Sequence, residues 1–292
     1  MTLPERDTRV TYPDGALTAT TRVLHVAPAG DGRVAVITES TSFHPVDAAW
    51  PDQPADAGVI RSGAGEFPVR DAVVAATDGE MLHLGADIPV RKGTEGWAFV
   101  VAHLVDEGTA IAEVDEVEIE ADAATRRALS AGHTACHLAA LALNRVLADR
   151  WTKAVREDAL GSPDFDGAAI ASSRIVPNGS VDRYRLNKSL RRAGFDTASL
   201  QGDLDGLRHA VAAQLAQWIA TGATVRVVRD GDGLTDRRSW VCELPDGTAR
   251  IPCGGTHLTS LAELATVTPG FTLVDDAGTP VLEMANEARL RH

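Results

Sequence analysis

The sequence contains little of what secreted and membrane-spanning proteins need. Its 292 residues include only three cysteines, Cys136, Cys242 and Cys253, which are too few for a disulfide framework and are typical of a reducing cytoplasm. No run of about 18 apolar residues is present, and the N-terminal MTLPERDTRV lacks the apolar stretch of a secretory signal. We therefore expect a cytoplasmic protein with no membrane partner.

Positive charge is also scarce, because 28 Lys and Arg stand against 41 Asp and Glu. The whole excess lies in residues 1–121, which hold 21 acids and 8 bases, whereas residues 122–292 hold 20 of each. An acidic protein repels phosphate at long range, which argues against a general DNA- or RNA-binding protein. One segment, VDRYRLNKSLRR (181–192), has five bases and one acid and is a local candidate for contact with nucleic acid.

The first part of the chain is predicted to consist of strands. Short runs rich in Val, Thr and Ile alternate with clusters of Gly, Pro and Asp, a spacing that favours a small barrel or sandwich. A proline-rich stretch, SFHPVDAAWPDQPADAG (42–58), is predicted to be an irregular loop. The predicted strands are residues 16–28, 33–39, 72–85 and 97–106.

A helical pattern begins near residue 121. Asp122 can cap a helix that the spacing of apolar residues carries to Trp151. We assign an α+β fold, with a small β-barrel domain (1–118) followed by a two-layer α/β domain (119–292) whose long helix packs on an antiparallel sheet. The other elements expected in this second domain are a helix at 205–220, strands at 224–230 and 238–244, and a final strand pair.

Two histidines lie four residues apart in the predicted long helix, in the sequence HTACH. His133 and His137 share one face, so both imidazoles can reach one metal ion. Taken alone, they could also be two ordinary helix residues. The zinc-protease motif HExxH has a glutamate as general base where this chain has Thr134. A protease of that kind is excluded, and a hydrolase would take its base from metal-bound water, a neighbouring group or the substrate.

A second pair occurs in CGGTH, where Cys253 and His257 flank two glycines. The glycines allow a sharp bend, so that a thiolate and an imidazole, both strong zinc ligands, can converge. An incidental cysteine and histidine at a Gly-Gly turn is the alternative. Together the pairs predict a Zn²⁺ site formed by His133, His137, Cys253 and His257. Because a catalytic zinc usually keeps one position open, His257 is either a fourth ligand or a catalytic group beside three ligands.

HTACHL followed by CGGTH resembles the motif pair HTAxH and CxGTH in the editing domain of alanyl- and threonyl-tRNA synthetases and in free-standing alanyl-tRNA editing proteins. Arg126, Arg127 and Leu129 before the first motif, and LTSLAEL after the second, are similar to the family as well. The resemblance covers residues 119–268. It implies a zinc-dependent, ATP-independent hydrolase that removes a wrong amino acid from tRNA by cleaving its ester to the terminal ribose.

A weaker resemblance extends to the family stretch TxFYPEGGGQPxDxG, which lies against the editing pocket in that family. In this chain the three glycines are absent, His44 replaces the tyrosine, and three extra residues separate Pro45 from Gln53. This change bears on which amino acid is removed. The matching positions are Thr41, Phe43, Pro45, Gln53, Pro54, Asp56 and Gly58.

The resemblance implies seryl-tRNA(Ala) as the substrate, since a small pocket discriminates poorly against an added hydroxyl. The altered loop favours an alternative, a larger or threonine-like amino acid on its own tRNA. With no synthetase core in the chain, we expect action in trans on released aminoacyl-tRNA. Two further hypotheses are a non-catalytic zinc protein that binds tRNA, and a hydrolase of small esters or amides, which the acidic first part favours.

Further site residues are expected from the resemblance and from the charge pattern. By the resemblance, Thr41 contacts the amino acid, and Gln53 and Thr256 are candidates for substrate binding, although each could simply shape its loop or turn. Cys136 points away from the histidine face and is expected in the core. The expected partner is mischarged tRNA rather than DNA. Its candidate contacts, which could equally form a solvated basic face, are Arg183, Arg185, Lys188, Arg191 and Arg192.

Overall fold

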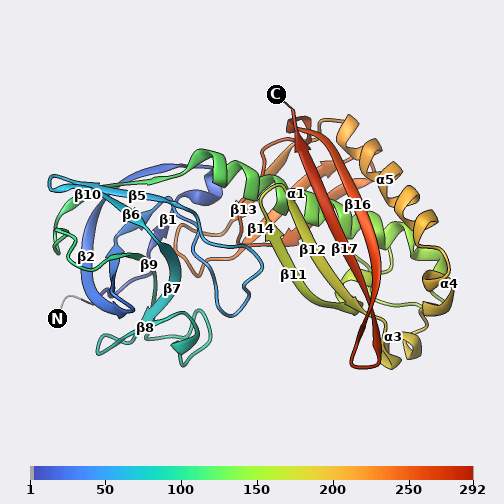
Figure 1. Cartoon of the computed structure of the whole chain (residues 1–292), viewed down its shortest axis with the longest axis horizontal. Coiled ribbons are helices and arrows are strands. Elements are labelled where there is room, and N and C mark those ends of the chain that lie inside the picture. Colours follow the sequence, from blue (N-terminus) through green and yellow to red (C-terminus); the bar gives the residue numbers. More distant parts are fainter. Residues whose placement is uncertain (1–2, 292) are drawn as a thin grey trace. The chain divides into compact units, whose positions relative to one another are not determined.

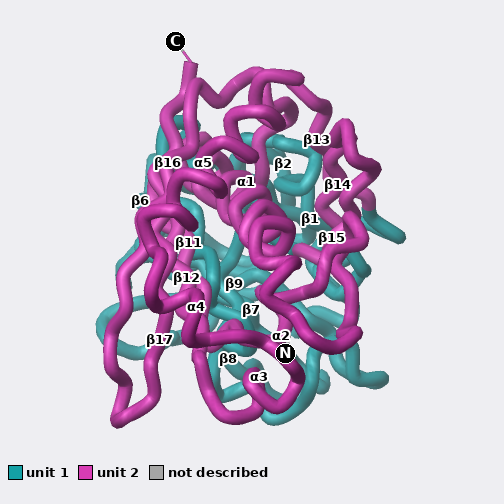
Figure 2. The backbone as a smooth tube through the Cα atoms, turned by 90° about the vertical axis from the view of Figure 1, so that its right-hand side faces the viewer, with its two compact units in different colours: residues 1–126, 229–238, 254–256 teal, residues 127–228, 239–253, 257–292 magenta. Residues whose placement is uncertain are grey.

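The computed structural model describes residues 3–291 (Figure 1). The chain forms two compact units, coloured separately in Figure 2. Unit 1 consists of the described residues up to Arg126, together with Arg229–Arg238 and Gly254–Thr256. Unit 2 consists of Arg127–Val228, Ser239–Cys253 and the described residues from His257 onward. None of the helices formed by residues 3–291 is long and apolar enough to cross a membrane.

Unit 1 is built mainly from one antiparallel sheet of eight strands, in the order β6-β5-β10-β2-β3-β9-β7-β8. A separate parallel pair joins β1 to β4. The strands are β1 (Arg9–Val10), β2 (Thr18–Gly30), β3 (Arg33–Thr38), β4 (Ser40–Thr41), β5 (Gly58–Ser62), β6 (Gly65–Val69), β7 (Asp71–Thr77), β8 (Leu82–Leu84), β9 (Ala98–Asp106) and β10 (Glu116–Ala121).

The core of unit 1 covers both faces of the central strands. Successive strand residues point to opposite faces, and here both sets are apolar. Val36 and Val101 belong to the larger cluster on one face, and Ala35 and Val100 to a smaller one on the other. The segment between β13 and β14 contributes Leu234 to the larger cluster, which explains why residues 229–238 belong to unit 1.

The closed β-barrel predicted for the first part of the chain is not found in the described residues. The sheet ends on β6 and β8, which pair with β5 and β7 only, so no ladder joins the two edges. Closure of a barrel requires strand tilt and register to match around the whole ring. The edge strand β8 is only three residues long, so it provides few backbone groups for such pairing. The mixed fold of helices and mostly sheet is confirmed; the predicted domain boundary at 118/119 stays a prediction.

Unit 2 combines two antiparallel sheets with two long helices (Figure 1). One sheet has the order β11-β12-β17-β16 and the other β13-β14-β15. Helices α1 and α5 contribute to the same apolar core as β14 and β17. The elements are α1 (Ala123–Val146), α2 (Phe165–Ala169), β11 (Ile170–Val176), β12 (Gly179–Arg185), α3 (Lys188–Arg192), α4 (Thr197–Gln201), α5 (Leu204–Ala220), β13 (Val225–Arg229), β14 (Arg238–Leu244), β15 (Gly247–Pro252), β16 (Leu264–Asp276) and β17 (Thr279–Leu290).

Helix α1 is the element that positions the candidate site. It packs through its own small and apolar residues, of which Ala131, Ala135 and Leu138 are fully buried. Its Gly132 lies against the β11–β12 turn so closely that a Cβ would collide with the carbonyl oxygens of Val176 and Gly179. A larger residue at position 132 would therefore displace either the turn or the helix segment that carries His133.

Several predicted elements are confirmed and others have different ends. The second helix and the final strand pair appear as α5 and β16–β17. The run 72–85 is two strands, because the Asp78 side chain accepts hydrogen bonds from the backbone N–H groups of Glu80 and Met81 and so stabilises a turn. Helix α1 stops at Val146, and Trp151 is extended and bridges to Phe195.

Candidate metal centre

Four side chains of unit 2 converge at one point. The ligand atoms of His133, His137, Cys253 and His257 all lie within 4.8 Å of one another, a group that could hold one metal ion. Two of these residues come from α1, and two come from the segment that follows β15, about 120 residues later in the chain. The two motifs singled out in the sequence are therefore brought together, as a shared metal site requires.

Helix α1 supplies the first half of the cluster. The ring centroids of His133 and His137, one helical turn apart, are separated by 4.9 Å. His133 is almost completely buried, whereas His137 is partly exposed. The indole of Trp240 on β14 packs against His137, with ring centroids 5.0 Å apart. Trp240 is fully buried and thus forms an apolar wall of the cluster.

The CGGTH segment supplies the second half. Cys253 is the first residue after β15, and its Sγ lies 3.4 Å from Nε2 of His133 and 3.2 Å from Nε2 of His257. The His257 ring lies 4.3 Å from the His133 ring and 5.1 Å from the His137 ring, centroid to centroid. The thiol and the three imidazoles therefore face a common centre.

The chemistry of this cluster fits a metal ion. Nε2 of His137 is buried, and no hydrogen-bond partner for it exists among the described residues. Burial lowers the pKa of His137 from 6.5 to about 4, so its imidazole is neutral at physiological pH and offers a lone pair. A buried polar atom without a partner is costly, and a metal ion would remove that cost.

Thr134 has a role that the sequence did not reveal. Its side chain is fully buried, and its Oγ1 accepts a hydrogen bond from the backbone N–H of Leu258 at 3.1 Å. The same oxygen lies 3.4 Å from Nδ1 of His257. Thr134 thus occupies the position of the protease glutamate but holds the CGGTH segment against α1. Only the tertiary contact identifies this role, as it does for Trp240.

The loop 42–58 of unit 1 brings together two of the predicted substrate residues. The Gln53 carboxamide donates to Thr256 Oγ1 at 3.0 Å and accepts from the Thr256 backbone N–H at 3.1 Å. Both residues belong to unit 1, and Thr256 directly precedes His257 in the chain. At the other end of the loop, Asp56 forms a buried ion pair with Arg126, whose Nε lies 2.8 Å from Oδ1.

Thr41, the third predicted substrate residue, lies in the core of unit 1. Its side chain is fully buried. The Oγ1 atom lies 2.8 Å from Nε2 of His103 and accepts the backbone N–H of Phe43 at 3.0 Å. The hydroxyl is therefore already engaged, and contact between Thr41 and an amino acid stays a prediction.

The predicted tRNA contacts lie at the end of β12 and on α3. Arg183 is half-buried and pairs with Glu283 at 3.8 Å. The other four are exposed, and the structure of residues 3–291 contains no carboxylate paired with any of them. They therefore present unneutralised positive charge to solvent, a property that a phosphate contact requires. These four residues are Arg185, Lys188, Arg191 and Arg192.

Cys136 lies apart from the metal cluster, as predicted. It is buried with Leu129 and Ile175, and its Sγ lies 3.5 Å from a carboxylate oxygen of Asp182. Burial and the nearby Asp182 raise the pKa of the Cys136 thiol well above its usual range. The thiol therefore stays protonated and is a poor metal ligand.

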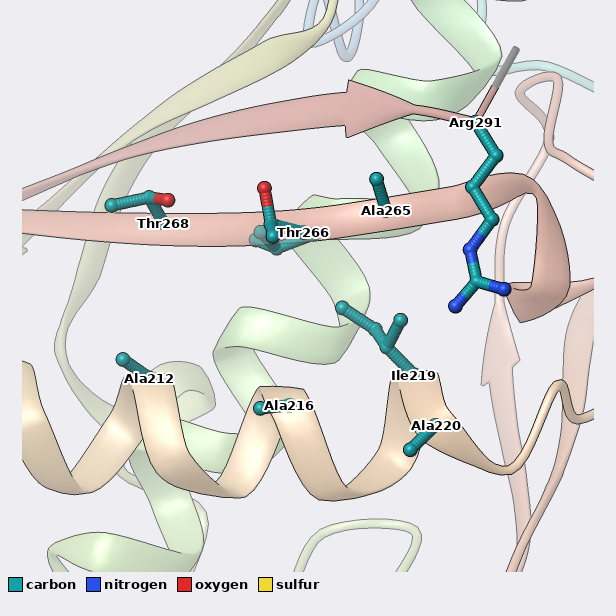
Figure 3. Close-up of a pocket in the computed structure, with 9 residues that line it drawn as sticks. Ala212, Ala216, Ile219, Ala220, Ala265, Thr266, Thr268 and Arg291 are labelled. Carbon is teal, nitrogen blue, oxygen red and sulfur yellow. The ribbon is translucent and has the colours of Figure 1, made fainter.

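A hollow elsewhere in unit 2 has a different character. It lies between α5 and β16, where Figure 3 shows alanine and threonine side chains along the walls and the guanidinium of Arg291 at one end. Its lining contains no histidine, cysteine or carboxylate. The donor groups expected of a metal or hydrolytic site are thus found at the four-residue cluster and not here.

Three curated alanine–tRNA ligases are similar in sequence to this chain. The chain is 27% identical over 271 residues to the alanine–tRNA ligase of Ruegeria pomeroyi, an alignment that covers 90% of this chain and 26% of that protein. For the alanine–tRNA ligases of Akkermansia muciniphila and Frankia alni the identity is 29%, over 81% and 84% of this chain and 21% and 23% of theirs. The chain is similar to a segment of alanine–tRNA ligases. It spans about a quarter of the length of these curated relatives, and no family model matches it.

Proposed function

We propose that this chain is a zinc-dependent aminoacyl-tRNA deacylase that hydrolyses the ester of mischarged tRNA. The observation that carries the proposal is the convergence of His133, His137, Cys253 and His257. Similarity to alanine–tRNA ligases over more than four fifths of the chain supports a substrate that includes tRNA. This function places the protein in the cytoplasm, where translation takes place.

Zinc is the proposed ion because imidazole and thiolate are its preferred protein ligands. His133, His137 and Cys253 would hold it, and His257 would be either the fourth ligand or a catalytic group. When bound, the ion supplies Lewis acidity at the ester carbonyl or at the attacking water. A set of three protein ligands suits catalysis, because it keeps a position open for water or substrate.

The protein groups have separate tasks in this reaction. A water oxygen bonds to the ester carbonyl carbon, the bond from that carbon to the ribose oxygen breaks, and the ribose oxygen leaves with a proton. With three ligands at the metal, Nε2 of His257 would accept the proton of the attacking water and return it to the leaving ribose oxygen, and Thr134 would orient the ring through Nδ1. The fully buried Trp240 beside His137 excludes bulk water from that side of the cluster.

Serine attached to alanine tRNA is the first substrate to test. Serine differs from alanine by one added hydroxyl, and an aminoacylation site for a small amino acid discriminates poorly against such a group. Mischarged serine therefore has to be removed after aminoacylation. The altered loop 42–58 favours a second candidate, a larger or threonine-like amino acid, because the corresponding glycine-rich stretch lies against the editing pocket in the family that the sequence resembles. The exposed Arg185, Lys188, Arg191 and Arg192 are proposed to contact the tRNA backbone.

Deacylation assays test the proposal directly. Seryl-tRNA(Ala) and a panel of threonyl-tRNAs would be incubated with the zinc-loaded protein, a His133→Ala variant and a His209→Ala control, whose exposed histidine lies on α5 in the same unit. We expect release of one amino acid by the wild type and His209→Ala but not by His133→Ala. If the folded, zinc-loaded protein releases none, a non-catalytic zinc protein is the better interpretation. If metal removal unfolds the protein, the ion is structural.

A further inference from the structure

Trp240 on β14 carries a buried hydrogen-bond donor without a partner. Its side chain is fully buried, and its Nε1–H has no acceptor among residues 3–291. The almost fully buried Trp218 on α5 shows the usual arrangement, because its Nε1–H donates to the Asp246 carboxylate at 2.8 Å. A buried N–H that lacks an acceptor costs free energy in the folded protein. Trp240 therefore has a donor that a ligand could use.

The indole of Trp240 packs against the metal cluster. Its ring centroid is 5.0 Å from that of His137 and 6.2 Å from that of His257. In the β14–β15 hairpin, Trp240 is paired with Ile251, two residues before Cys253. All five residues belong to unit 2. The unsatisfied donor is thus carried by a ring that lies beside the cluster, within the same compact unit.

The indole differs in chemistry from the members of the cluster. Neutral imidazoles and a thiolate present lone pairs, which bind a cation. Nε2 of His137 is such an acceptor, and it is also buried without a partner among the described residues. The indole N–H of Trp240 can only donate. A cation would satisfy His137 but not Trp240, so the ligand that satisfies Trp240 has to provide an atom with a lone pair.

An aminoacyl ester provides such an atom in its carbonyl oxygen. This oxygen gains negative charge when water attacks the carbonyl carbon. A donor that is fixed in place and shielded from bulk water stabilises the developing charge more than it stabilises the neutral ester. A hydrogen bond to another part of the substrate, such as a ribose or side-chain hydroxyl, would be equally strong before and during the reaction. The first contact acts on kcat, whereas the second acts on KM.

We propose that the indole N–H of Trp240 donates a hydrogen bond to the carbonyl oxygen of the aminoacyl ester during hydrolysis. This inference rests on the proposed deacylase function and adds a catalytic residue to it. As the water oxygen bonds to the carbonyl carbon, the carbonyl oxygen takes up the negative charge that the N–H stabilises. When the bond to the ribose oxygen breaks, the carbonyl double bond forms again. The indole keeps its proton throughout.

A phenylalanine at position 240 removes the N–H and keeps an aromatic ring. For the aminoacyl-tRNA that the wild type hydrolyses, Trp240→Phe should lower kcat about 100-fold, with KM and zinc affinity unchanged. Trp151→Phe is the matched control. Nε1 of Trp151 is likewise buried with no partner in the described part of the chain, but its ring packs on Phe195 in the same unit. The control should have the kcat and KM of the wild type.

Three kinetic results would overturn the inference. A higher KM at unchanged kcat would place the donor on another part of the substrate. An equal loss of kcat in Trp151→Phe, or a loss of zinc affinity in Trp240→Phe, would mean that the change acts through the structure of unit 2. If the wild type deacylates no aminoacyl-tRNA, the proposed function is overturned, and this inference with it.

The indole proton gives a second readout, which does not require Trp240→Phe to fold. The chain has five tryptophans, so the Trp240 resonance is the one that persists when each of the other four is replaced by phenylalanine. The probes are adenosines with serine or threonine in amide linkage at the 3′ carbon. We expect the Trp240 N–H resonance of the zinc-loaded wild type to move downfield at probe concentrations that inhibit deacylation. An unmoved resonance in a protein that deacylates tRNA would overturn the inference and leave the proposed function intact.

Discussion

Each unit contains a histidine whose pKa is lowered to about 4, and the two imidazoles differ in their partners. His103 lies on β9 in unit 1, opposite Val36 in the neighbouring strand. Its Nδ1 is 3.0 Å from the Val36 carbonyl, which can only accept, so Nδ1 carries the proton. Its Nε2 therefore accepts the hydroxyl proton of Thr41 at 2.8 Å. Both ring nitrogens of His103 are satisfied.

His137 in unit 2 has the same low pKa but an incomplete set of partners. Its Nε2 is buried without a hydrogen bond among the described residues, next to the rings of His133 and His257 and the thiol of Cys253. Burial and a depressed pKa thus do not separate a structural histidine from a ligand. An unsatisfied nitrogen beside other donors does separate them, and this difference can be tested residue by residue.

The largest contrast is expected between His137→Ala and His103→Ala. Loss of His137 removes a proposed metal ligand, so we expect metal affinity and deacylation to fall more than about 100-fold, beyond the effect of losing a group that only orients a ligand. Loss of His103 leaves the Val36 carbonyl and the Thr41 hydroxyl unsatisfied and should lower the free energy of unfolding by about 3 kcal/mol. Metal content, initial rates and urea titrations measure the three effects. Equal metal loss in both variants would contradict the distinction.

Acid should destabilise the protein through the satisfied histidine as well. The pKa of His103 is 6.5 in the unfolded chain and about 4 when folded, because burial disfavours the charged ring. Above pH 6.5 both states are neutral; as the pH falls toward 4, only the unfolded state gains the proton, so stability is lost. At 1.36 kcal/mol per pH unit, this interval corresponds to about 3 kcal/mol.

A His103→Gln variant isolates that contribution from the other histidines. Its free energy of unfolding should fall by about 3 kcal/mol less than that of the wild type between pH 6.5 and pH 4. Urea titrations at a series of pH values give both curves. Parallel curves for the two proteins would show that His103 is not the group that binds the proton.

Metal binding should stabilise the fold through unit 2 only. Zinc at 100 times its dissociation constant is expected to raise the free energy of unfolding by about 2.7 kcal/mol. The increase should disappear when a chelator is added and in the His137→Ala variant. It should persist in His103→Gln, because His103 does not belong to the four-residue cluster. Thermal or urea unfolding with and without zinc measures it. An equal increase in His137→Ala would place the ion elsewhere.

The four members of the metal cluster could be predicted from sequence because helical spacing and a Gly-Gly bend fix local geometry. His133 and His137 share a helix face whatever the rest of the fold does. The contributions of Thr134 and Trp240 depend on how the CGGTH segment and β14 pack against α1, and no local pattern encodes that packing. For the same reason, the hydrogen bond between Thr41 and His103, which lie 62 residues apart in the chain, could not be predicted from the sequence.

The fold also contains pairings between distant segments that local sequence patterns could not predict. Alternation and turn residues predicted β2, β3 and β9 and one run that covers β7 and β8, but not β1, β4, β5, β6 or β10. The closed barrel depended on pairing between two edge strands, β6 and β8, which no local signal specifies. The helix was predicted to continue to Trp151, since its residues have suitable propensity, but α1 ends at Val146 and Trp151 pairs with Phe195. Local propensity was overruled there by a contact 44 residues distant.

The smallest and sharpest contrast lies between two threonines, each beside a histidine. Thr134 lies 3.4 Å from Nδ1 of His257, and Thr41 lies 2.8 Å from Nε2 of His103. Valine keeps the shape of threonine and removes the hydroxyl. If His257 is the fourth ligand, Thr134→Val should lower metal affinity by about 10- to 100-fold, since it frees the His257 ring and the Leu258 N–H, whereas Thr41→Val should leave metal affinity unchanged. Competition with a chelator of known affinity measures both. Equal metal affinities would mean that Thr134 does not orient His257 as a metal ligand, and the two histidine–threonine pairs would then be alike with respect to the metal.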